Sequence, residues 1–264
     1  MRIKNNTKFN VLITRPEEKG LQLTQQLNSI GINSICQSFF EYQPYTNEQQ
    51  IRQMLKKSPP DIIIFVSVAA VIFANRALRI KEWFNKSSSQ PIQVFAVGHA
   101  TKKALNGCSI EDVISHKDQN SEGLLTLCGL NEVQYKNILI VRGDGGREYL
   151  NDILSERGAT VNYLESYQRI WLTFNHAIVK QWQADQINVI VVTSNALLQR
   201  IVDLITTFIN TLPSDEKLML SHWQQNCLWV VASRRIAERA KALGLINIVN
   251  AKGANDQAII KALS

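Results

Sequence analysis

The chain has 264 residues, with 29 Lys and Arg against 22 Asp and Glu, so its formal net charge is +7. With 45% hydrophobic and 19% charged residues, it has the composition of a globular protein, which excludes long disorder, collagen and coiled coil. The length favours two modest domains. The charge favours an anionic partner without saying which anion.

The N-terminal segment MRIKNNTKFN is basic but lacks the apolar block of a signal peptide. The longest apolar stretch, residues 62–74, is shorter than the ~20 residues of a membrane span. We therefore expect a cytoplasmic protein that is neither exported nor bound in a membrane. The cysteines form no CxxC and no metal-spaced pair with histidine, which predicts reduced, buried thiols rather than disulfides. They are Cys36, Cys108, Cys128 and Cys227.

An internal repeat with an offset of 127 residues is the most informative feature. It superposes VLITRPEEKGLQLTQQLNSIG, from Val11, on ILIVRGDGGREYLNDILSERG, from Ile138. The same shift places Ser67 on Ser194. Further along, the second copy is eight residues longer, with the insertion predicted within residues 206–226. The repeat predicts two similar halves.

Short β-branched runs alternate with helical patterns along both copies, which predicts an α/β fold with parallel sheets flanked by helices. The first helix of each copy is the clearest. In the first copy Pro16 suits the first helical turn, Leu23, Leu27 and Ile30 share one face, and Gly31 ends the helix. Leu150, Leu154 and Gly158 repeat this scheme. The predicted strands are 11–14, 62–66, 94–97, 138–141, 189–193 and 228–232.

Small, hydroxylated, glycine and arginine residues follow these strands. At the carboxyl end of a parallel sheet, such residues and helix N-termini can hold carboxylates or phosphates, which predicts an anion-binding cleft between the halves. The alternative is that each hydroxyl merely caps its helix. The residues are Arg15, 67–69, 98–101, 142–147, 193–196 and 233–235.

Other sequence motifs say less about function. The turn from Gly143 to Gly146 fits neither GxGxxG nor the P-loop pattern, because position 148 is Glu; Glu165 keeps a nucleotide interpretation open as a possible ribose ligand. The histidines form no HxH or HExxH, and no GxSxG occurs. The basic cluster at 234–241 fits the polar face of an amphipathic helix better than a nucleic-acid surface.

The ordered set of segments resembles the uroporphyrinogen-III synthase family and covers nearly the whole chain from Val11 onward. The most specific is RGDGGREYL followed by RGATVNYLESYQR. The others are VLITRPEEKGLQLTQQLNSIG, DIIIFVSVAAV, VFAVGHAT, NSEGLL, VIVVTSNAL and VVASRRIAERAKALG.

The resemblance implies two α/β domains joined by a two-stranded linker. Domain 1 would be discontinuous, from 1–38 and 172–264, domain 2 would span 44–166, and the linker strands would be 39–43 and 167–171. The paired segments SFFEYQP and ESYQRIW are compatible with such a crossing. Periodicity alone does not show it.

The resemblance also implies an activity: cyclisation of hydroxymethylbilane, a linear tetrapyrrole, with loss of water and inversion of ring D, giving uroporphyrinogen III for haem biosynthesis. No metal or organic cofactor is implied. We expect a monomer that binds this small molecule and neither nucleic acid nor a membrane. The substrate carries eight carboxylates, which suits a +7 protein. Two alternatives remain: a non-catalytic, two-domain polyanion-binding module, and a nucleotide-dependent enzyme.

Tyr167 occupies the family's tyrosine position and is the candidate donor of a proton or hydrogen bond to the departing hydroxyl. The alternative is a linker tyrosine that packs beside Tyr163. The chain departs from the family pattern at Ala69, Ser233 and Ile236, which puts carboxylate contacts there in doubt. The candidate substrate-binding residues are Arg15, Ser67, Gly98, Thr101, Ser121, Arg142, Gly143, Arg147, Thr193, Ser194, Asn195 and Ser233.

Overall fold

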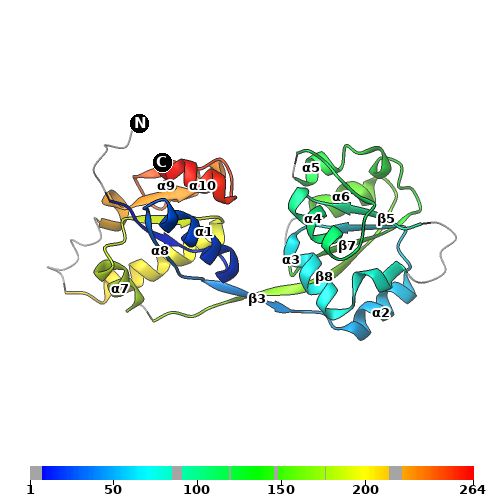
Figure 1. Ribbon diagram of the computed structural model, residues 1–264, viewed down its shortest axis with the longest axis horizontal. Helices are drawn as coiled ribbons and strands as arrows, with labels where there is room; N and C mark the ends of the chain where they lie inside the picture. Colours follow the sequence, from blue (N-terminus) through cyan, green and yellow to red (C-terminus); the bar gives the residue numbers. More distant parts are fainter. Residues whose placement is uncertain (1–7, 85–90, 119, 146–147, 176, 214–221) are drawn as a thin grey trace. The chain divides into compact units, whose positions relative to one another are not determined.

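The chain divides into two compact units (Figure 1). Unit 1 comprises Met1–Glu41 and Trp171–Ser264, and unit 2 comprises Tyr42–Ile170. Both divisions fall inside the segments predicted as linker strands. The computed structural model describes residues 8–84, 91–118, 120–145, 148–175, 177–213 and 222–264.

The described residues of unit 1 form a five-stranded sheet in the order β11-β10-β9-β1-β2, and its neighbouring strands pair in parallel. The strands are β1 (Asn10–Ile13), β2 (Asn33–Cys36), β9 (Val189–Val192), β10 (Leu228–Val231) and β11 (Ile248–Asn250). The helices are α1 (Glu17–Ser29), α7 (Ile178–Ala184), α8 (Asn195–Asn210), α9 (Arg234–Ala242), α10 (Asp256–Leu263) and a π-helical turn, His222–Asn226.

The described residues of unit 2 form a six-stranded sheet in the order β3-β8-β7-β4-β5-β6. The strands are β3 (Phe40–Pro44), β4 (Ile62–Phe65), β5 (Gln93–Ala96), β6 (Val113–Ser115), β7 (Asn137–Gly143) and β8 (Thr160–Trp171). The helices are α2 (Glu48–Lys57), α3 (Val68–Ala77), α4 (His99–Gly107), α5 (Ser121–Leu124), α6 (Tyr149–Glu156) and the 3₁₀ turns Ile80–Phe84 and Cys128–Leu130. The neighbouring strands from β8 to β6 pair in parallel, as predicted, and helices flank the sheet. The β3–β8 pair is antiparallel, because Phe39 bonds to Leu172 and Tyr45 to Ser166.

The two sheets are equivalent, but each mixes the two copies of the sequence repeat. In unit 1, β1 and β2 of the first copy lie beside β9, β10 and β11 of the second. In unit 2, β7 and β8 of the second copy lie beside β4, β5 and β6 of the first. The five strands of unit 1 therefore correspond in order to β6, β5, β4, β7 and β8 of unit 2, and β3 has no counterpart among the described strands of unit 1. Each unit exchanges one strand-helix-strand segment with the other.

Alternate residues of the unit 2 strands enter two separate cores, as buried parallel strands require. On one face Ile63 and Phe65 pack with residues of α2, α3 and α4. On the other face Ile62 and Ile64 pack with residues of α5 and α6. In unit 1, alternate residues of β1 and β9 pack against α1 and α10. The six β-branched runs are thus strands because both of their faces are covered.

The first helix of each copy ends as predicted. Gly31 has φ +83° and Gly158 has φ +85°, a left-handed conformation that glycine adopts without a steric penalty. Two details of the prediction are wrong. Pro16 lies one residue before α1, as its N-cap. Ile30 is 55% exposed because α1 stops at Ser29, so the apolar face ends at Leu27.

The thiol prediction holds only in part. All four cysteines are free, but only Cys227 is buried, and burial raises the pKa of its thiol. Cys128 is exposed because it begins a 3₁₀ turn whose buried residue is Leu130. Among the described residues, no helix is long and apolar enough to cross a membrane.

Candidate functional site at the strand ends

Tyr167 lies where β8 passes the carboxyl end of β7, and the backbone there is irregular. Arg142 pairs with Glu165 but Gly143 pairs with Tyr167, so Ser166 is an extra residue in the ladder. The bulge turns the Tyr167 ring over Gly143. A Cβ atom at position 143 would lie 2.5 Å from Cζ of Tyr167, a distance that real Cβ atoms do not reach. Glycine is therefore required beneath this ring.

The Tyr167 hydroxyl lies 3.4 Å from Oγ of Ser67, which comes directly before α3. Its ring packs edge-on against Tyr42, with centroids 4.8 Å apart, and beside Phe73, with centroids 5.6 Å apart. The phenol is thus held by aromatic contacts and has one hydroxyl neighbour. Tyr163 packs on the other face of the sheet, where it stacks on the Arg142 guanidinium. The partners of the packing alternative are therefore Tyr42 and Phe73 rather than Tyr163.

The turn after β7 fixes the backbone of β8 at this point. The Asp144 N–H donates to the Tyr167 carbonyl oxygen at 2.8 Å, and the Asp144 carboxylate accepts the N–H of Arg169 at 3.0 Å. The buried hydroxyl of Ser166 lies 3.1 Å from the Arg142 carbonyl oxygen. These bonds determine which way the Tyr167 side chain leaves the strand.

Arg142 is buried and is neutralised within unit 2. Its guanidinium donates to Glu148 at 2.9 Å and to Glu165 at 3.1 Å, and lies 3.6 Å from the Tyr163 ring centroid. Burial alone would lower the pKa of Arg142, but these hydrogen bonds outweigh it and raise the pKa. The Tyr163 hydroxyl and Arg142 both donate to Glu148 and lower the pKa of its carboxyl.

Arg15, the repeat partner of Arg142, is neutralised in the same way in unit 1. It is only 5% exposed, and its guanidinium donates to the Asp256 carboxylate and to the Ala254 carbonyl oxygen. Arg15 and Arg142, two of the three predicted substrate-binding arginines, thus have acidic partners in their own unit. A carboxylate of a substrate would have to share them or displace those partners.

Three predicted hydroxyls are helix caps. The side chains of Ser67, Ser194 and Ser233 accept the N–H of the residue three positions on, at 3.1, 3.2 and 3.4 Å. This is the capping alternative, and it leaves a second lone pair and the hydroxyl proton available at each site.

Of the remaining predicted residues, Gly98, Thr101, Thr193 and Asn195 lie just after strand ends. Thr101 is buried, and its hydroxyl donates to the Val97 carbonyl oxygen at 2.9 Å. Gly98 precedes α4 with φ +86°. Ser121 begins α5, but the cap of that helix is Asn120. Thr193 and Asn195 flank Ser194, and the Asn195 Oδ1 is buried without a hydrogen-bond partner among the described residues. Arg147 lies outside the described residues.

The glycine turn after β7 does not favour a phosphate. The Glu165 carboxylate that accepts from Arg142 also accepts the Gly145 N–H at 3.4 Å. A carboxylate in this position occupies the turn's donor and would repel an anion. Glu165, the predicted ribose ligand, therefore already accepts hydrogen bonds from Arg142 and from the turn, which argues against the nucleotide interpretation.

Sequence reasoning did not find the residues that orient the site. Tyr42 and Phe73 hold the Tyr167 ring, and Asp256 holds Arg15 across 241 residues of sequence. The pairing of the linker segments is a signal that places Tyr42 near Tyr167; nothing in the sequence pairs Arg15 with Asp256. Among the described residues, no group of three or more His, Cys, Asp and Glu side chains could hold a metal ion.

Ser67, Gly143 and Tyr167 thus lie together in unit 2, and Arg15, Thr193, Ser194, Asn195 and Ser233 lie at strand ends of unit 1. Parallel sheets with polar carboxyl ends define a duplicated α/β protein with strand-end sites.

Solved structures share this fold. A mutant uroporphyrinogen III synthase of Thermus thermophilus has a TM-score of 0.60 at 12% identity, with 97% of each chain covered. The uroporphyrinogen-III synthetase of Helicobacter pylori 26695 has a TM-score of 0.58 at 15% identity, covering 97% of this chain and 98% of that one.

Sequence comparison identifies the family. Residues 22–261 match the family model "Uroporphyrinogen-III synthase HemD". The uroporphyrinogen-III synthase of Escherichia coli K12 is 32% identical over 97% of this chain and all of its own length. That of Salmonella typhimurium LT2 is 30% identical with the same coverage. The chain belongs to the uroporphyrinogen-III synthase family.

Proposed function

We propose that this protein cyclises hydroxymethylbilane with inversion of ring D and loss of water, giving uroporphyrinogen III. The family match over residues 22–261 carries this proposal. The strand-end geometry supports it, because a held phenol suits a reaction in which a hydroxyl must leave a flexible chain. Much of the catalysis would then be positioning, which needs few acid-base groups.

In this proposal Tyr167 donates a proton or hydrogen bond to the departing hydroxyl of the bilane. A tyrosine carries its proton at neutral pH and can act as a donor. The proton from Tyr167 lets the hydroxyl leave as water and gives a cationic azafulvene, which the substituted carbon of ring D attacks to form a new carbon–carbon bond. The bond from that carbon to its original methylene bridge then breaks and leaves a second azafulvene on the neighbouring ring. The free α-carbon of ring D closes the inverted ring there and loses its proton, which returns to the Tyr167 phenolate. Ser67 Oγ, 3.4 Å from the Tyr167 hydroxyl, orients the phenol.

The eight carboxylates of the substrate need donors, and the proposed contacts are the predicted strand-end residues. Helix N-termini contribute N–H groups and a favourable dipole even where the side chain is small, as at Ala69. Ser67, Ser194 and Ser233 keep a hydroxyl proton to donate while they cap. Arg15 and Arg142 would act mainly by fixing the loops around them, because each is paired internally.

We propose further that the protein acts as a cytoplasmic monomer on this linear tetrapyrrole and binds no nucleic acid. The basic residues Arg234 and Arg239 lie on α9, whose buried residues are Ile236 and Ala240, as expected for the polar face of an amphipathic helix. Arg234 pairs with Glu238 on the same helix.

The test is the isomer formed from enzymatically generated hydroxymethylbilane, separated by chromatography after oxidation to porphyrin. Uroporphyrin III above the level without protein is expected. Only type I product, at the spontaneous rate, would contradict the proposal, and thermal stabilisation by the bilane without product would indicate a binding module instead. Tyr167→Phe should lower turnover by about 10²-fold or more, with the unfolding midpoint little changed.

A further inference from the structure

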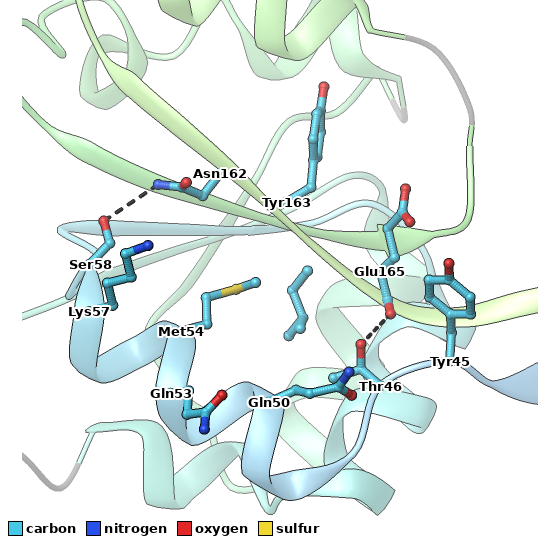
Figure 2. A pocket seen from close by; sticks show the side chains of 11 residues that line it. Tyr45, Thr46, Gln50, Gln53, Met54, Lys57, Ser58, Asn162, Tyr163 and Glu165 are labelled. Atoms are coloured by element: carbon cyan, nitrogen blue, oxygen red, sulfur yellow. Dashed lines mark hydrogen bonds between the residues drawn. The ribbon is translucent and has the colours of Figure 1, made fainter.

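A groove of about 800 Å³ lies in unit 2 between α2 and the outer edge of β8 (Figure 2), and Tyr167 is not part of its lining. We call it the β8–α2 groove. It is lined by Tyr45, Thr46, Gln50, Gln53, Met54, Lys57, Ser58, Asn162, Tyr163, Leu164 and Glu165.

One wall of the groove is a strand edge. Among the described residues, the hydrogen-bonded neighbours of β8 are β7 and β3, and β3 ends at Pro44. Beyond β3, two more hydrogen bonds join the chain to β8. The Tyr45 N–H donates to the Ser166 carbonyl oxygen at 3.2 Å, and the Thr46 hydroxyl donates to the Glu165 carbonyl oxygen at 2.7 Å. The chain then turns away into α2, so the edge before Glu165 has no neighbouring strand in the described part of the chain.

The direction of the peptide groups confirms that this edge faces the groove. Thr160 donates its N–H to Lys136, on the β7 side, at 2.9 Å. Because successive residues of a strand alternate, Val161 and Tyr163 turn their N–H and C=O groups to the groove side. The side chains of Tyr163 and Glu165 point away from α2 (Figure 2). They line the groove with their backbone.

The opposite wall is one face of α2. Gln50, Met54 and Lys57 are spaced as neighbours on a helix surface, with Met54 packed on the core that contains Leu164. The floor is therefore apolar and the rim carries amides. Such a slot, between a helix and an open strand edge, suits an extended peptide that adds a strand and places alternate side chains on the floor.

One end of the groove carries a cation and two polar side chains. Lys57, Ser58 and Asn162 gather there (Figure 2), with the Asn162 amide 3.4 Å from the Ser58 hydroxyl. Lys57 is exposed and forms no ion pair with a described residue, whereas the Glu165 carboxylate is held by Arg142 on the other side of β8. The free charge of the groove is thus one ammonium group beside two hydrogen-bond donors.

We propose that the β8–α2 groove binds the C-terminal tail of a partner protein as a strand antiparallel to β8, with its terminal carboxylate at Lys57, Ser58 and Asn162. The tail continues the direction of β3. From Glu165 to Asn162 there is room for about three residues at ~3.3 Å each. Main-chain bonds supply affinity, and the carboxylate sets the register.

The test is fluorescence polarisation of the full chain with a labelled pentapeptide, glycine-valine-threonine-valine-valine, carrying a free C-terminal carboxylate. Saturable binding is expected, and amidating the C-terminus or N-methylating the amides that face β8 should weaken it at least tenfold. Lys57→Glu should weaken it about fivefold or more. Lys56→Glu, one residue away on the exposed side of α2, is the matched control and should change binding less than twofold.

Several results would overturn the proposal. These are no binding at millimolar peptide, equal binding of acid and amide, equal effects of the two lysine variants, or an unchanged exchange rate of the Tyr163 amide on saturation. If the protein self-associates and Lys57→Glu abolishes that self-association, the groove binds a second copy of the chain instead. None of these readouts depends on synthase activity, so they are separate from the test of the proposed function.

Discussion

The aromatic ring of Tyr167 packs directly on the backbone of Gly143. The ring of Tyr167 lies so close to the Gly143 Cα that an added Cβ would meet Cζ at 2.5 Å, Cε2 at 2.6 Å and the hydroxyl oxygen at 2.9 Å. The contact exists because the β8 bulge shifts the register by one residue between Arg142 and Gly143. The position of the phenol therefore depends on the absence of a side chain.

Gly143→Ala should displace the Tyr167 ring. We expect a loss of about 1–3 kcal/mol in the free energy of unfolding from overpacking, and a fall in turnover similar to that of Tyr167→Phe. Urea unfolding and the isomer assay measure the two effects. Gly107→Ala is the control, because an added Cβ there meets nothing within 4 Å and φ is not positive. Full activity of Gly143→Ala would show that the ring position does not matter.

Ser67→Ala removes both the cap of α3 and the hydroxyl neighbour of Tyr167. Loss of the cap should cost about 1 kcal/mol of stability. If Ser67 acts through the phenol, turnover should fall in the wild-type background and not fall further in Tyr167→Phe. Asn47→Ala, which removes the cap of α2 in the same unit, should lose similar stability and keep full turnover. Additive effects of Ser67→Ala and Tyr167→Phe would contradict the coupling.

Asp256→Ala leaves the guanidinium of Arg15 buried without its acidic partner. We expect a loss of about 1–3 kcal/mol in the free energy of unfolding, because a buried charged donor loses its acceptor. Arg15→Met in the same chain should recover part of that loss, since the unpaired charge is then gone. Asp203→Ala, at an exposed acid on α8, serves as the control and should change stability by less than about 0.5 kcal/mol. If Asp256→Ala left the free energy of unfolding unchanged, the Arg15–Asp256 pair would contribute nothing to stability.

Glu148 should make stability depend on pH in the acid range. Hydrogen bonds from Tyr163 and Arg142 lower its pKa below the ordinary 4.5, so the unfolded chain takes up the proton first. Its stabilising contribution is therefore present above that ordinary value and lost as the pH falls through the folded pKa. Urea midpoints between pH 3 and 6 should fall less steeply for Glu148→Gln than for the wild type. Parallel curves would exclude Glu148 as the source.

The local features of the fold were predictable because they depend on residues close in sequence. The β-branched runs gave all six predicted strands, and Gly31 and Gly158 marked the helix ends through their positive φ. The caps followed from serine at helix starts. Where the prediction was wrong, as for Ile30 and Cys128, the error lay in where a helix ends or how a short turn faces, which local pattern specifies poorly.

The sequence by itself determined the parallel α/β architecture, the duplication and the family. Tertiary structure decided which segments share a sheet. β1 pairs with β9 of the second copy rather than with β4 of its own copy, although β4 and β9 are equally apolar. Strands from equivalent copies satisfy the same burial pattern, so periodicity cannot choose between them. The partners of Arg15 and Arg142 and the ring contacts of Tyr167 likewise arise from that long-range pairing, because contacts between distant segments leave no period in the sequence.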